Sequence, residues 1–236
     1  MSAPILITGV GKRIGYALAK HLLNAGQPVI GTYRTEHDSI TELRLLGAEL
    51  HYCDFYDDDQ IATLISTIND NHSSLRAIIH NASDWLPDNN ALAPATTLAR
   101  MMQVHVNTPY QINLALADLL EANETEFSDI IHFTDYVAEK GSKKHIAYAA
   151  SKAALTNMTL SFSALLAPKV KVNAIAPAMI MFNPDDDEDY RSKALKKSLM
   201  QSEPGTLEII ETVNYLLKSR YVTGRTLHVD GGRHLK

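Results

Sequence analysis

The sequence predicts an α/β protein built as one doubly wound parallel sheet with helices on both faces. Short apolar segments alternate with longer segments of helical periodicity along the whole chain. Several short segments are apolar on both faces, which is typical of parallel strands that helices cover on each side. The expected strands are residues 5–8, 28–33, 49–53, 76–80, 129–133 and 170–175, and the expected helices are residues 13–25, 39–46, 58–71, 95–122 and 147–166.

Bulk properties limit the possible functions. The chain has 236 residues, 45% of them hydrophobic, and no internal repeat or linker, which predicts a single domain spanning residues 1–236. A net charge of −5 argues against a general nucleic-acid binder, which needs a basic face to neutralise phosphates. No signal peptide is visible and no apolar run reaches the roughly 20 residues of a membrane helix. We therefore expect a cytoplasmic protein that binds neither nucleic acid nor membrane.

Three minor features are best explained without catalysis. The single cysteine, Cys53, excludes an intramolecular disulfide and is expected to be a buried strand thiol. The acidic segment 183–189 reads as a solvated loop before a helix at 190–200, because consecutive carboxylates cannot converge on one ion. The ten histidines show no metal-ligand spacing, so we expect no metal site. Closure of residues 185–200 over a substrate is a hypothesis from their late position alone.

A glycine-rich turn follows the first expected strand and opens the first helix. It reads Thr8-Gly9-Val10-Gly11-Lys12-Arg13-Ile14-Gly15. Small residues there let the backbone approach a pyrophosphate at the positive end of the helix. A tight structural turn is the alternative, but the placement between strand and helix favours a dinucleotide-binding Rossmann fold.

The end of the second strand indicates which dinucleotide is used. NAD-dependent proteins of this architecture place an acidic residue there, on the ribose hydroxyls. Here Tyr33, Arg34 and Thr35 follow the strand instead. Arg34 and Thr35 could hold a 2′-phosphate, with Lys12 within reach, which favours NADPH. The alternative is that Arg34 is an unpaired surface arginine.

Tyr148 and Lys152 lie four residues apart, on one face of an expected helix. Hydride transfer to a C=O or C=N carbon leaves a heteroatom that needs a proton. A free tyrosine has a pKa of about 10, and we expect the Lys152 charge to lower it enough for proton exchange near neutrality. The spacing alone is common in helices.

The conjunction of motifs is specific and resembles the short-chain dehydrogenase/reductase family over essentially the whole chain. In order, the motifs are Thr8-Gly9 with Gly15, Asn81-Ala82, Asn107, Tyr148 with Lys152, the segment from Asn173 to Pro177, and Tyr221 to Gly224 with Val229 to Gly232. The resemblance implies a sheet of about seven parallel strands and a homotetramer. It implies that Asn107 helps hold a water linked to Lys152 and that Asp54 meets the adenine, where a plain helix cap is the alternative.

By the same resemblance, the cofactor site can be assigned residue by residue. The implied cofactor-binding residues are Gly9, Lys12, Arg13, Ile14, Gly15, Tyr33, Arg34, Thr35, Asp54, Phe55, Asn81, Ala82, Ser83, Tyr148, Lys152 and Pro177. The implied catalytic residues are Tyr148, Lys152, Asp135 and Asn107.

Departures from the family pattern bear on the substrate. Arg13 replaces the usual middle glycine of the turn, and Asp135 lies where the family carries a substrate-polarising serine. These residues, with Ser83 and Trp85, resemble the pteridine reductase branch, closest to its bacterial members that reduce 7,8-dihydromonapterin with NADPH and also act on dihydrofolate. The implied substrate-binding residues are Arg13, Ser83, Trp85, Asp135 and Tyr148.

The residue chemistry agrees with a pterin substrate. Trp85 could stack on a flat heteroaromatic ring, although a packing role is the alternative. An Asp135–Tyr148 pair can relay a proton to N5 of a dihydropterin as hydride reaches C6. Alternatively, Asp135 caps a strand end or pairs with Lys143 or Lys144. Two other functions stay open: a reductase of simple ketones, and a non-catalytic NADPH-binding sensor.

Overall fold

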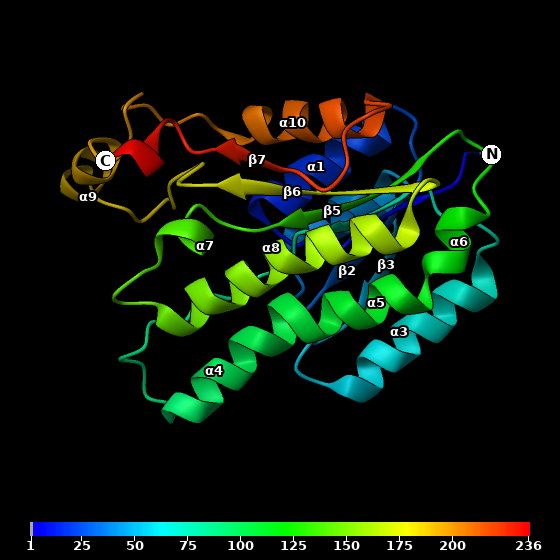
Figure 1. Cartoon of the computed structure of the whole chain (residues 1–236), viewed down its shortest axis with the longest axis horizontal. Helices are drawn as coiled ribbons and strands as arrows, with labels where there is room; N and C mark the ends of the chain where they lie inside the picture. Colours follow the sequence, from blue (N-terminus) through cyan, green and yellow to red (C-terminus); the bar gives the residue numbers. More distant parts are fainter. Residues whose placement is uncertain (1) are drawn as a thin grey trace.

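The computed structural model describes residues 2–236 and contains one seven-stranded parallel sheet in the order β3-β2-β1-β4-β5-β6-β7. Helices cover both faces of this sheet (Figure 1), so the predicted fold class is confirmed. The strands are β1 Ile5–Ile7, β2 Val29–Tyr33, β3 Glu49–Tyr52, β4 Ala77–His80, β5 Ser128–Phe133, β6 Val170–Pro177 and β7 Thr226–Val229.

The helices form two layers, each with its own hydrophobic core. They are α1 Arg13–Asn24, α2 Asp38–Leu45, α3 Asp58–Asn71, α4 Pro94–Met102, α5 Thr108–Ala115, α6 Ala117–Glu121, α7 Val137–Lys140, α8 Ile146–Leu166, α9 Glu188–Leu195 and α10 Thr206–Lys218. Side chains of α1, α2 and α10 pack on one sheet face, and those of α3, α5 and α8 pack on the other. The sheet strands are buried between these layers because their side chains are apolar in both directions.

The prediction of one continuous helix over residues 95–122 is wrong. The structure divides it into α4, a π-helical turn at Gln103–Asn107, α5 and α6. Pro109 has no backbone N–H to donate to the carbonyl four residues earlier, which disrupts the α-helical ladder. The residues just before Pro109 form the wider π-turn, a geometry frequent at functional sites. Leu116, with φ −108° and ψ 10°, separates α5 from α6.

Three elements after residue 136 were not revealed by periodicity. α7, α10 and β7 were not among the expected segments, although the resemblance implied a seventh strand. The helix expected at residues 190–200 is α9, Glu188–Leu195, and it starts earlier because the Asp187 carboxylate accepts a hydrogen bond from Tyr190 N at 2.7 Å. The acidic segment therefore caps a helix and is otherwise exposed.

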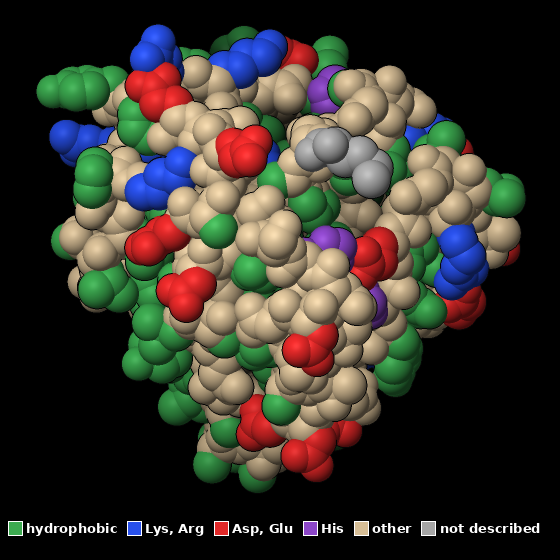
Figure 2. Space-filling model, turned by 90° about the vertical axis from the view of Figure 1, so that its right-hand side faces the viewer, with side chains coloured by type: hydrophobic (Ala, Val, Ile, Leu, Met, Phe, Trp, Pro, Cys, Tyr) green, Lys and Arg blue, Asp and Glu red, His purple; other side chains and the backbone are tan. Residues whose placement is uncertain are grey.

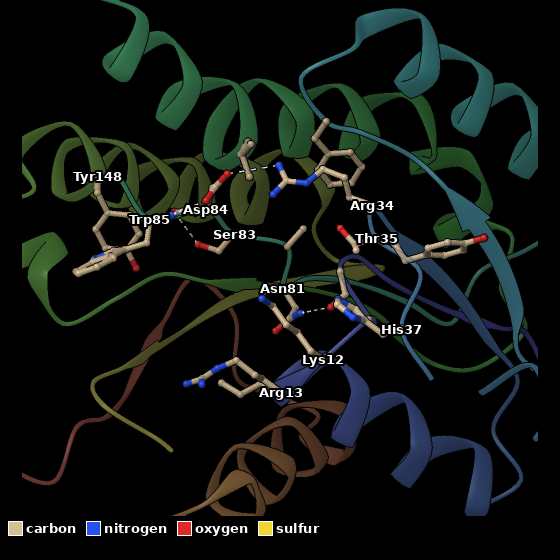
Figure 3. Close-up of a pocket in the computed structure, with 18 residues that line it drawn as sticks. Lys12, Arg13, Arg34, Thr35, His37, Asn81, Ser83, Asp84, Trp85 and Tyr148 are labelled. Atoms are coloured by element: carbon tan, nitrogen blue, oxygen red, sulfur yellow. Dashed lines mark hydrogen bonds and ion pairs between the residues drawn. The ribbon is translucent and has the colours of Figure 1, made fainter. Parts of the chain in front are cut away.

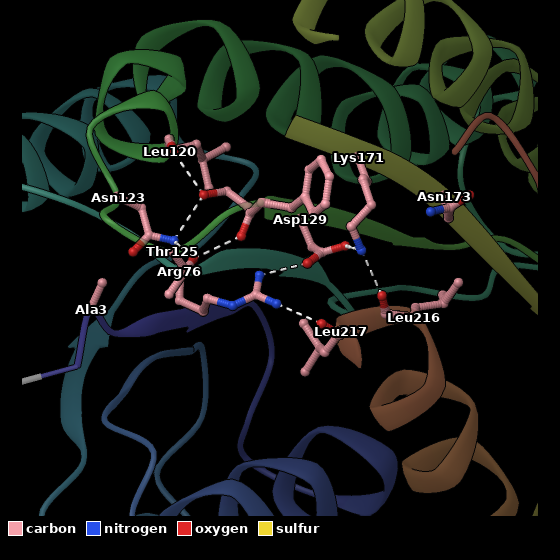
Figure 4. Close-up of polar contacts among 12 residues, drawn as sticks. Ala3, Arg76, Leu120, Asn123, Thr125, Asp129, Lys171, Asn173, Leu216 and Leu217 are labelled. Atoms are coloured by element: carbon pink, nitrogen blue, oxygen red, sulfur yellow. Dashed lines mark hydrogen bonds and ion pairs between the residues drawn. The ribbon is translucent and has the colours of Figure 1, made fainter. Parts of the chain in front are cut away.

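A buried ion triad holds the end of α10 against the amino ends of the central strands (Figure 4). Asp129 is fully buried and lies 2.5 Å from Arg76 Nη1 and 2.6 Å from Lys171 Nζ. The same two cations donate to the carbonyls of Leu217 and Leu216, in the last turn of α10. Positive charge is favourable at that end of a helix because the macrodipole is negative there.

At this same end of the molecule, the described residues form no continuous basic area on the face drawn in Figure 2. Figure 2 shows Lys, Arg, Asp and Glu side chains dispersed among polar and apolar ones on the face drawn. No helix among residues 2–236 is both long enough and apolar enough to span a lipid bilayer.

Cys53 directly follows β3 and is buried, as predicted. Burial raises the pKa of its thiol to about 12, with the negative charge of Asp54 adding to the effect. The thiolate, which is the reactive form, is therefore disfavoured near neutral pH.

Candidate active site

A cleft of about 580 Å³ opens beyond the carboxyl ends of β1, β2 and β4. The winding direction of the sheet reverses between β1 and β4, which is where ligands bind in open parallel sheets. Figure 3 shows side chains from the first turn, the end of β2 and the segment after β4 converging on it. The lining residues are Gly9, Gly11, Lys12, Arg13, Ile14, Gly15, Tyr33, Arg34, Thr35, His37, Phe55, Asn81, Ala82, Ser83, Asp84, Trp85, Val104 and Tyr148.

The floor of the cleft is the turn between β1 and α1, and it is too tight for side chains at two positions. Gly9 has φ +73°, and a Cβ there would lie 2.8 Å from Ala82 Cα. A Cβ on Gly15 would lie 2.1 Å from Gly9 O. The Asn81 amide donates to Thr8 O at 3.1 Å and Gly9 O at 2.9 Å, which ties this turn to the end of β4. The bare backbone at the start of α1 fits a bound pyrophosphate.

Arg13 holds a backbone conformation that normally favours glycine. Its φ is +55°, in the left-handed region, which costs a non-glycine residue roughly 1–2 kcal/mol. Its guanidinium donates to Asn183 Oδ1 at 2.5 Å and to Met181 O at 2.9 Å, and Arg13 lines the cleft. Backbone strain at a cationic residue of a cleft is typical of a binding role.

The far end of the cleft is lined by cationic and hydroxyl groups. Lys12, Arg34 and Thr35 are exposed there. Arg34 Nη1 lies 3.4 Å from Asp84 Oδ2 and 3.9 Å from Asp54 Oδ1. Because Arg34 is half exposed, these contacts bind it weakly and leave it able to take a phosphate.

Asp54 is not part of the cleft lining, although its neighbour Phe55 is. The Asp54 carboxylate accepts a hydrogen bond from Tyr56 N at 3.1 Å, and the cap of α3 is Asp57. Asp54 is therefore not the cap of α3, and its contact with the adenine stays a prediction. Asp54 acts here on the turn before α3 and on Arg34.

At the other end of the cleft, Tyr148 and Asp135 form a hydrogen-bonded pair. The Tyr148 hydroxyl donates to Asp135 Oδ2 at 2.8 Å, and Asp135 Oδ1 accepts from Val137 N at 2.9 Å. Asp135 thus has a local turn contact, but its partner is Tyr148 and not Lys143 or Lys144. Burial raises the pKa of the Asp135 carboxyl, against the opposing effects of these hydrogen bonds and of Lys152.

Lys152 lies one helical turn further along α8. The residue is 2% exposed, and its ammonium donates to Phe133 O at 2.7 Å and lies 5.6 Å from the centre of the Tyr148 ring. Burial lowers the pKa of Lys152 to about 8.

The expectation that Lys152 lowers the pKa of Tyr148 is wrong for this structure. Burial raises the pKa of the phenol well above 10, and the negative Asp135 raises it further, while the Ser83 hydroxyl opposes the shift. The Lys152 ammonium is anchored on a backbone carbonyl and faces the ring, so it does not offset these effects. Tyr148 is therefore held as a neutral phenol, which suits a proton donor.

Asn107 does not join this group through its side chain. It is exposed, and its amide donates to Gln103 Oε1 at 2.6 Å within the π-turn. The buried His105 of the same turn lies against Tyr148 instead, with ring centres 5.4 Å apart. His105 Nε2 contacts Ser83 Oγ and its Nδ1 contacts Ser151 Oγ, both at 2.8 Å. Burial lowers the pKa of His105 well below 6.5, so the ring is neutral.

Trp85 forms one wall of the cleft near Tyr148 (Figure 3). It is 60% exposed and does not belong to any hydrophobic core. One face of its indole stacks on His145, with ring centres 4.0 Å apart and planes inclined by 23°. The exposure does not fit a residue retained for core packing.

The structure thus brings most of the implied residues to one cleft and places five outside its lining. Lys152 and Asp135 lie behind Tyr148, Pro177 is buried at the end of β6, Asp54 faces Arg34, and Asn107 is bonded to Gln103. Sequence reasoning missed His37, Asp84, Val104 and His105. Only Asp84 carried a signal, since it lies between the implied residues Ser83 and Trp85.

The fold, the turn at the switch point and the Tyr148–Lys152 pair together define a Rossmann-fold oxidoreductase of the tyrosine–lysine type. A family profile described as enoyl-(acyl carrier protein) reductase matches residues 9–234. The chain belongs to the short-chain dehydrogenase/reductase family, in the branch of the bacterial dihydromonapterin reductases.

Individual relatives support this placement. A dihydromonapterin reductase of Klebsiella pneumoniae is 57% identical over 233 residues, covering 99% of this chain and 97% of the relative. One from Escherichia coli O6:H1 is 54% identical over 235 residues, covering 100% and 98%. Among solved structures, the FolM alternative dihydrofolate reductase 1 of Brucella suis, in complex with NADP, has a TM-score of 0.88 at 26% identity, covering 99% and 96%. The resemblance stated from the motifs is confirmed.

Proposed function

We propose that this protein is an NADPH-dependent reductase that converts 7,8-dihydromonapterin to its tetrahydro form and reduces dihydrofolate more slowly. The observation that carries the proposal is the Tyr148–Asp135 hydrogen bond beside the exposed ring of Trp85. An imine nitrogen takes up a proton during reduction, and a carboxyl–phenol pair can supply it. The identity of 54–57% to dihydromonapterin reductases supports the same substrate.

NADPH would lie along this cleft. The pyrophosphate would bind the bare backbone of the glycine turn at the start of α1, and a Cβ at Gly9 or Gly15 would displace that turn by colliding with Ala82 or with Gly9 O. Lys12, Arg34 and Thr35 would hold the 2′-phosphate, and Tyr148 with Lys152 would hold the nicotinamide ribose. When bound, NADPH supplies the hydride for C6 of the pterin.

The chain's own residues supply the proton. Tyr148 is neutral, so its hydroxyl can donate to N5 of the bound ring. Asp135 lies 2.8 Å behind it and, because burial raises its pKa, can carry a proton that replaces the one Tyr148 gives up. A serine in place of Asp135 could polarise a carbonyl but could not store this proton.

Lys152 completes the charge balance. Once a proton has left, one negative charge remains on the Tyr148–Asp135 pair in a buried setting. The Lys152 ammonium stabilises that charge on the Asp135 carboxylate, since its positive charge lowers the pKa of Asp135. Arg13 and Ser83 would bind the polar edge of the pterin while Trp85 covers its face.

The proposed assembly is a homotetramer in the cytoplasm. Exposed apolar side chains lie on α5 and α8, among them Tyr110, Leu114, Leu160 and Leu165. Apolar surface on two helices is a common signal of subunit association. Size-exclusion chromatography with light scattering tests the tetramer, and a monomeric mass would contradict it.

A substrate panel tests the proposed activity. Purified protein with NADPH should reduce 7,8-dihydromonapterin fastest, dihydrofolate more slowly and simple ketones poorly, and Tyr148→Phe should abolish all turnover while NADPH still binds. Robust reduction of ketones without dihydropterin turnover would instead establish the carbonyl reductase. Stoichiometric NADPH binding with no turnover of either class would support the non-catalytic sensor.

A further inference from the structure

Trp85 is held from one side by a residue that no step of the proposed mechanism uses. Its indole stacks on the imidazole of His145 with ring centres 4.0 Å apart and planes inclined by only 23°. The residue is nevertheless 60% exposed and lines the cleft. One face of the indole is therefore occupied by His145, which leaves the other available to a ligand.

The same loop is tied a second time to the same place. Asp88, three residues after Trp85, accepts hydrogen bonds from Ile146 N at 2.6 Å and Ala147 N at 3.3 Å. Its own backbone N donates to Lys144 O at 3.0 Å. The carboxylate thus satisfies free N–H groups at the start of α8, where negative charge is favourable. The stack and the cap together fix the Trp85 loop on the first turn of α8.

This first turn also carries the proton donor. Tyr148 follows His145 by three residues, so the two side chains lie about one turn apart on the helix. Any movement of Trp85 away from His145 would change the distance between the indole face and the Tyr148 hydroxyl. The loop and the helix start therefore set the position of a stacked ring relative to its proton donor.

The histidine is not explained by its polar contacts. Its Nε2 is buried with no hydrogen-bond partner among the described residues, and burial lowers the pKa of the imidazole. A neutral, flat imidazole with an unsatisfied nitrogen contributes little to folding through hydrogen bonding. What it contributes is a planar surface for the indole.

We propose that His145 is a positioning residue for the substrate: it packs against one face of Trp85, so that a flat heteroaromatic ring stacked on the other face lies at a fixed distance from Tyr148. This inference rests on the proposed function, because it takes a dihydropterin as the ring. It also predicts weak binding of open-chain ketones, which gain nothing from a rigid aromatic wall. An aromatic pair is worth roughly a twofold to twelvefold change in an equilibrium constant.

The test compares His145→Ala with His145→Phe, which keeps a flat ring without the nitrogens. His145→Ala should raise the KM for 7,8-dihydromonapterin about fivefold to tenfold and leave the KM for NADPH within about twofold. His145→Phe should restore the pterin KM. Because Trp85 is the only tryptophan, acrylamide quenching of its fluorescence in the ligand-free protein reports the stack directly, and His145→Ala should increase that quenching.

The outcomes separate this inference from the proposed function. Wild-type protein that reduces no dihydropterin would overturn the proposed function and the substrate named here. Wild-type turnover with an unchanged pterin KM in His145→Ala would overturn this inference alone. The inference would also be overturned if His145→Phe raised the pterin KM as much as His145→Ala does while its melting temperature and NADPH KM stayed normal.

Discussion

Replacing Asp135 by asparagine tests the proton path of this site. The substitution keeps the size of the side chain but removes the carboxyl group that can resupply a proton to Tyr148, 2.8 Å away, and that shares the negative charge left after proton transfer. A hydrogen bond to a charged group contributes roughly 1.5–3 kcal/mol, and each 1.36 kcal/mol is tenfold in rate. The kcat for 7,8-dihydromonapterin should therefore fall about 10-fold to 150-fold, while the KM for NADPH changes little.

The pH dependence gives a second readout of the same variant. Burial raises the pKa of Asp135, and the protonated carboxyl is the form that can resupply Tyr148. The wild-type kcat should accordingly fall as the pH rises through that pKa, and Asp135→Asn should lack this limb of the profile.

The assay is steady-state NADPH oxidation across a pH series, with Asp118→Asn as the matched control. Asp118 is an exposed carboxylate on α6. Its substitution likewise exchanges a carboxyl for an amide, but it does not alter the cleft. If Asp135→Asn keeps the wild-type kcat and pH profile, Asp135 is not part of the proton path and the reasoning is refuted.

Three further predictions concern the cofactor end and the scaffold. Arg34→Ala should raise the KM for NADPH about tenfold or more and leave that for NADH unchanged, and an equal effect on both cofactors would mean that Arg34 does not bind the 2′-phosphate. Arg13→Gly relieves a φ of +55°, so its melting temperature should stay within a few degrees of wild type while the pterin KM rises; a large loss of stability would show that its contacts are structural. Asp129→Asn leaves two cations without their buried partner and should lower the unfolding free energy by about 3–5 kcal/mol in urea titrations, whereas an unchanged midpoint would show that the triad is dispensable.

Much of the fold could be predicted because the governing signals are local. Strands apolar on both faces indicate a parallel sheet, and the glycine turn between strand and helix indicates where the sheet binds a dinucleotide. The structure agrees with both expectations. The sheet is parallel throughout, and the turn lines the cleft at the point between β1 and β4 where the winding reverses. The four-residue spacing of Tyr148 and Lys152 placed both on one side of α8.

The features that escaped prediction depend on backbone geometry and contacts that helical periodicity does not show. Asn107 lies in a π-helical turn, where its amide bonds Gln103, and periodicity does not anticipate such a turn. The raised pKa of Tyr148 comes from burial and Asp135, and neither is visible in the Tyr148–Lys152 spacing. The Trp85–His145 stack joins residues 60 positions apart, and no local pattern indicates it.

The most direct test of the account is where the hydride goes. Wild-type protein is incubated with 7,8-dihydromonapterin and NADPH deuterated at the transferable position, and the product is examined by NMR. We predict tetrahydromonapterin with deuterium at C6, and no comparable product with NADH. Full protein with bound NADPH that forms no C6-labelled tetrahydropterin, while a simple ketone becomes labelled, would contradict the central claim.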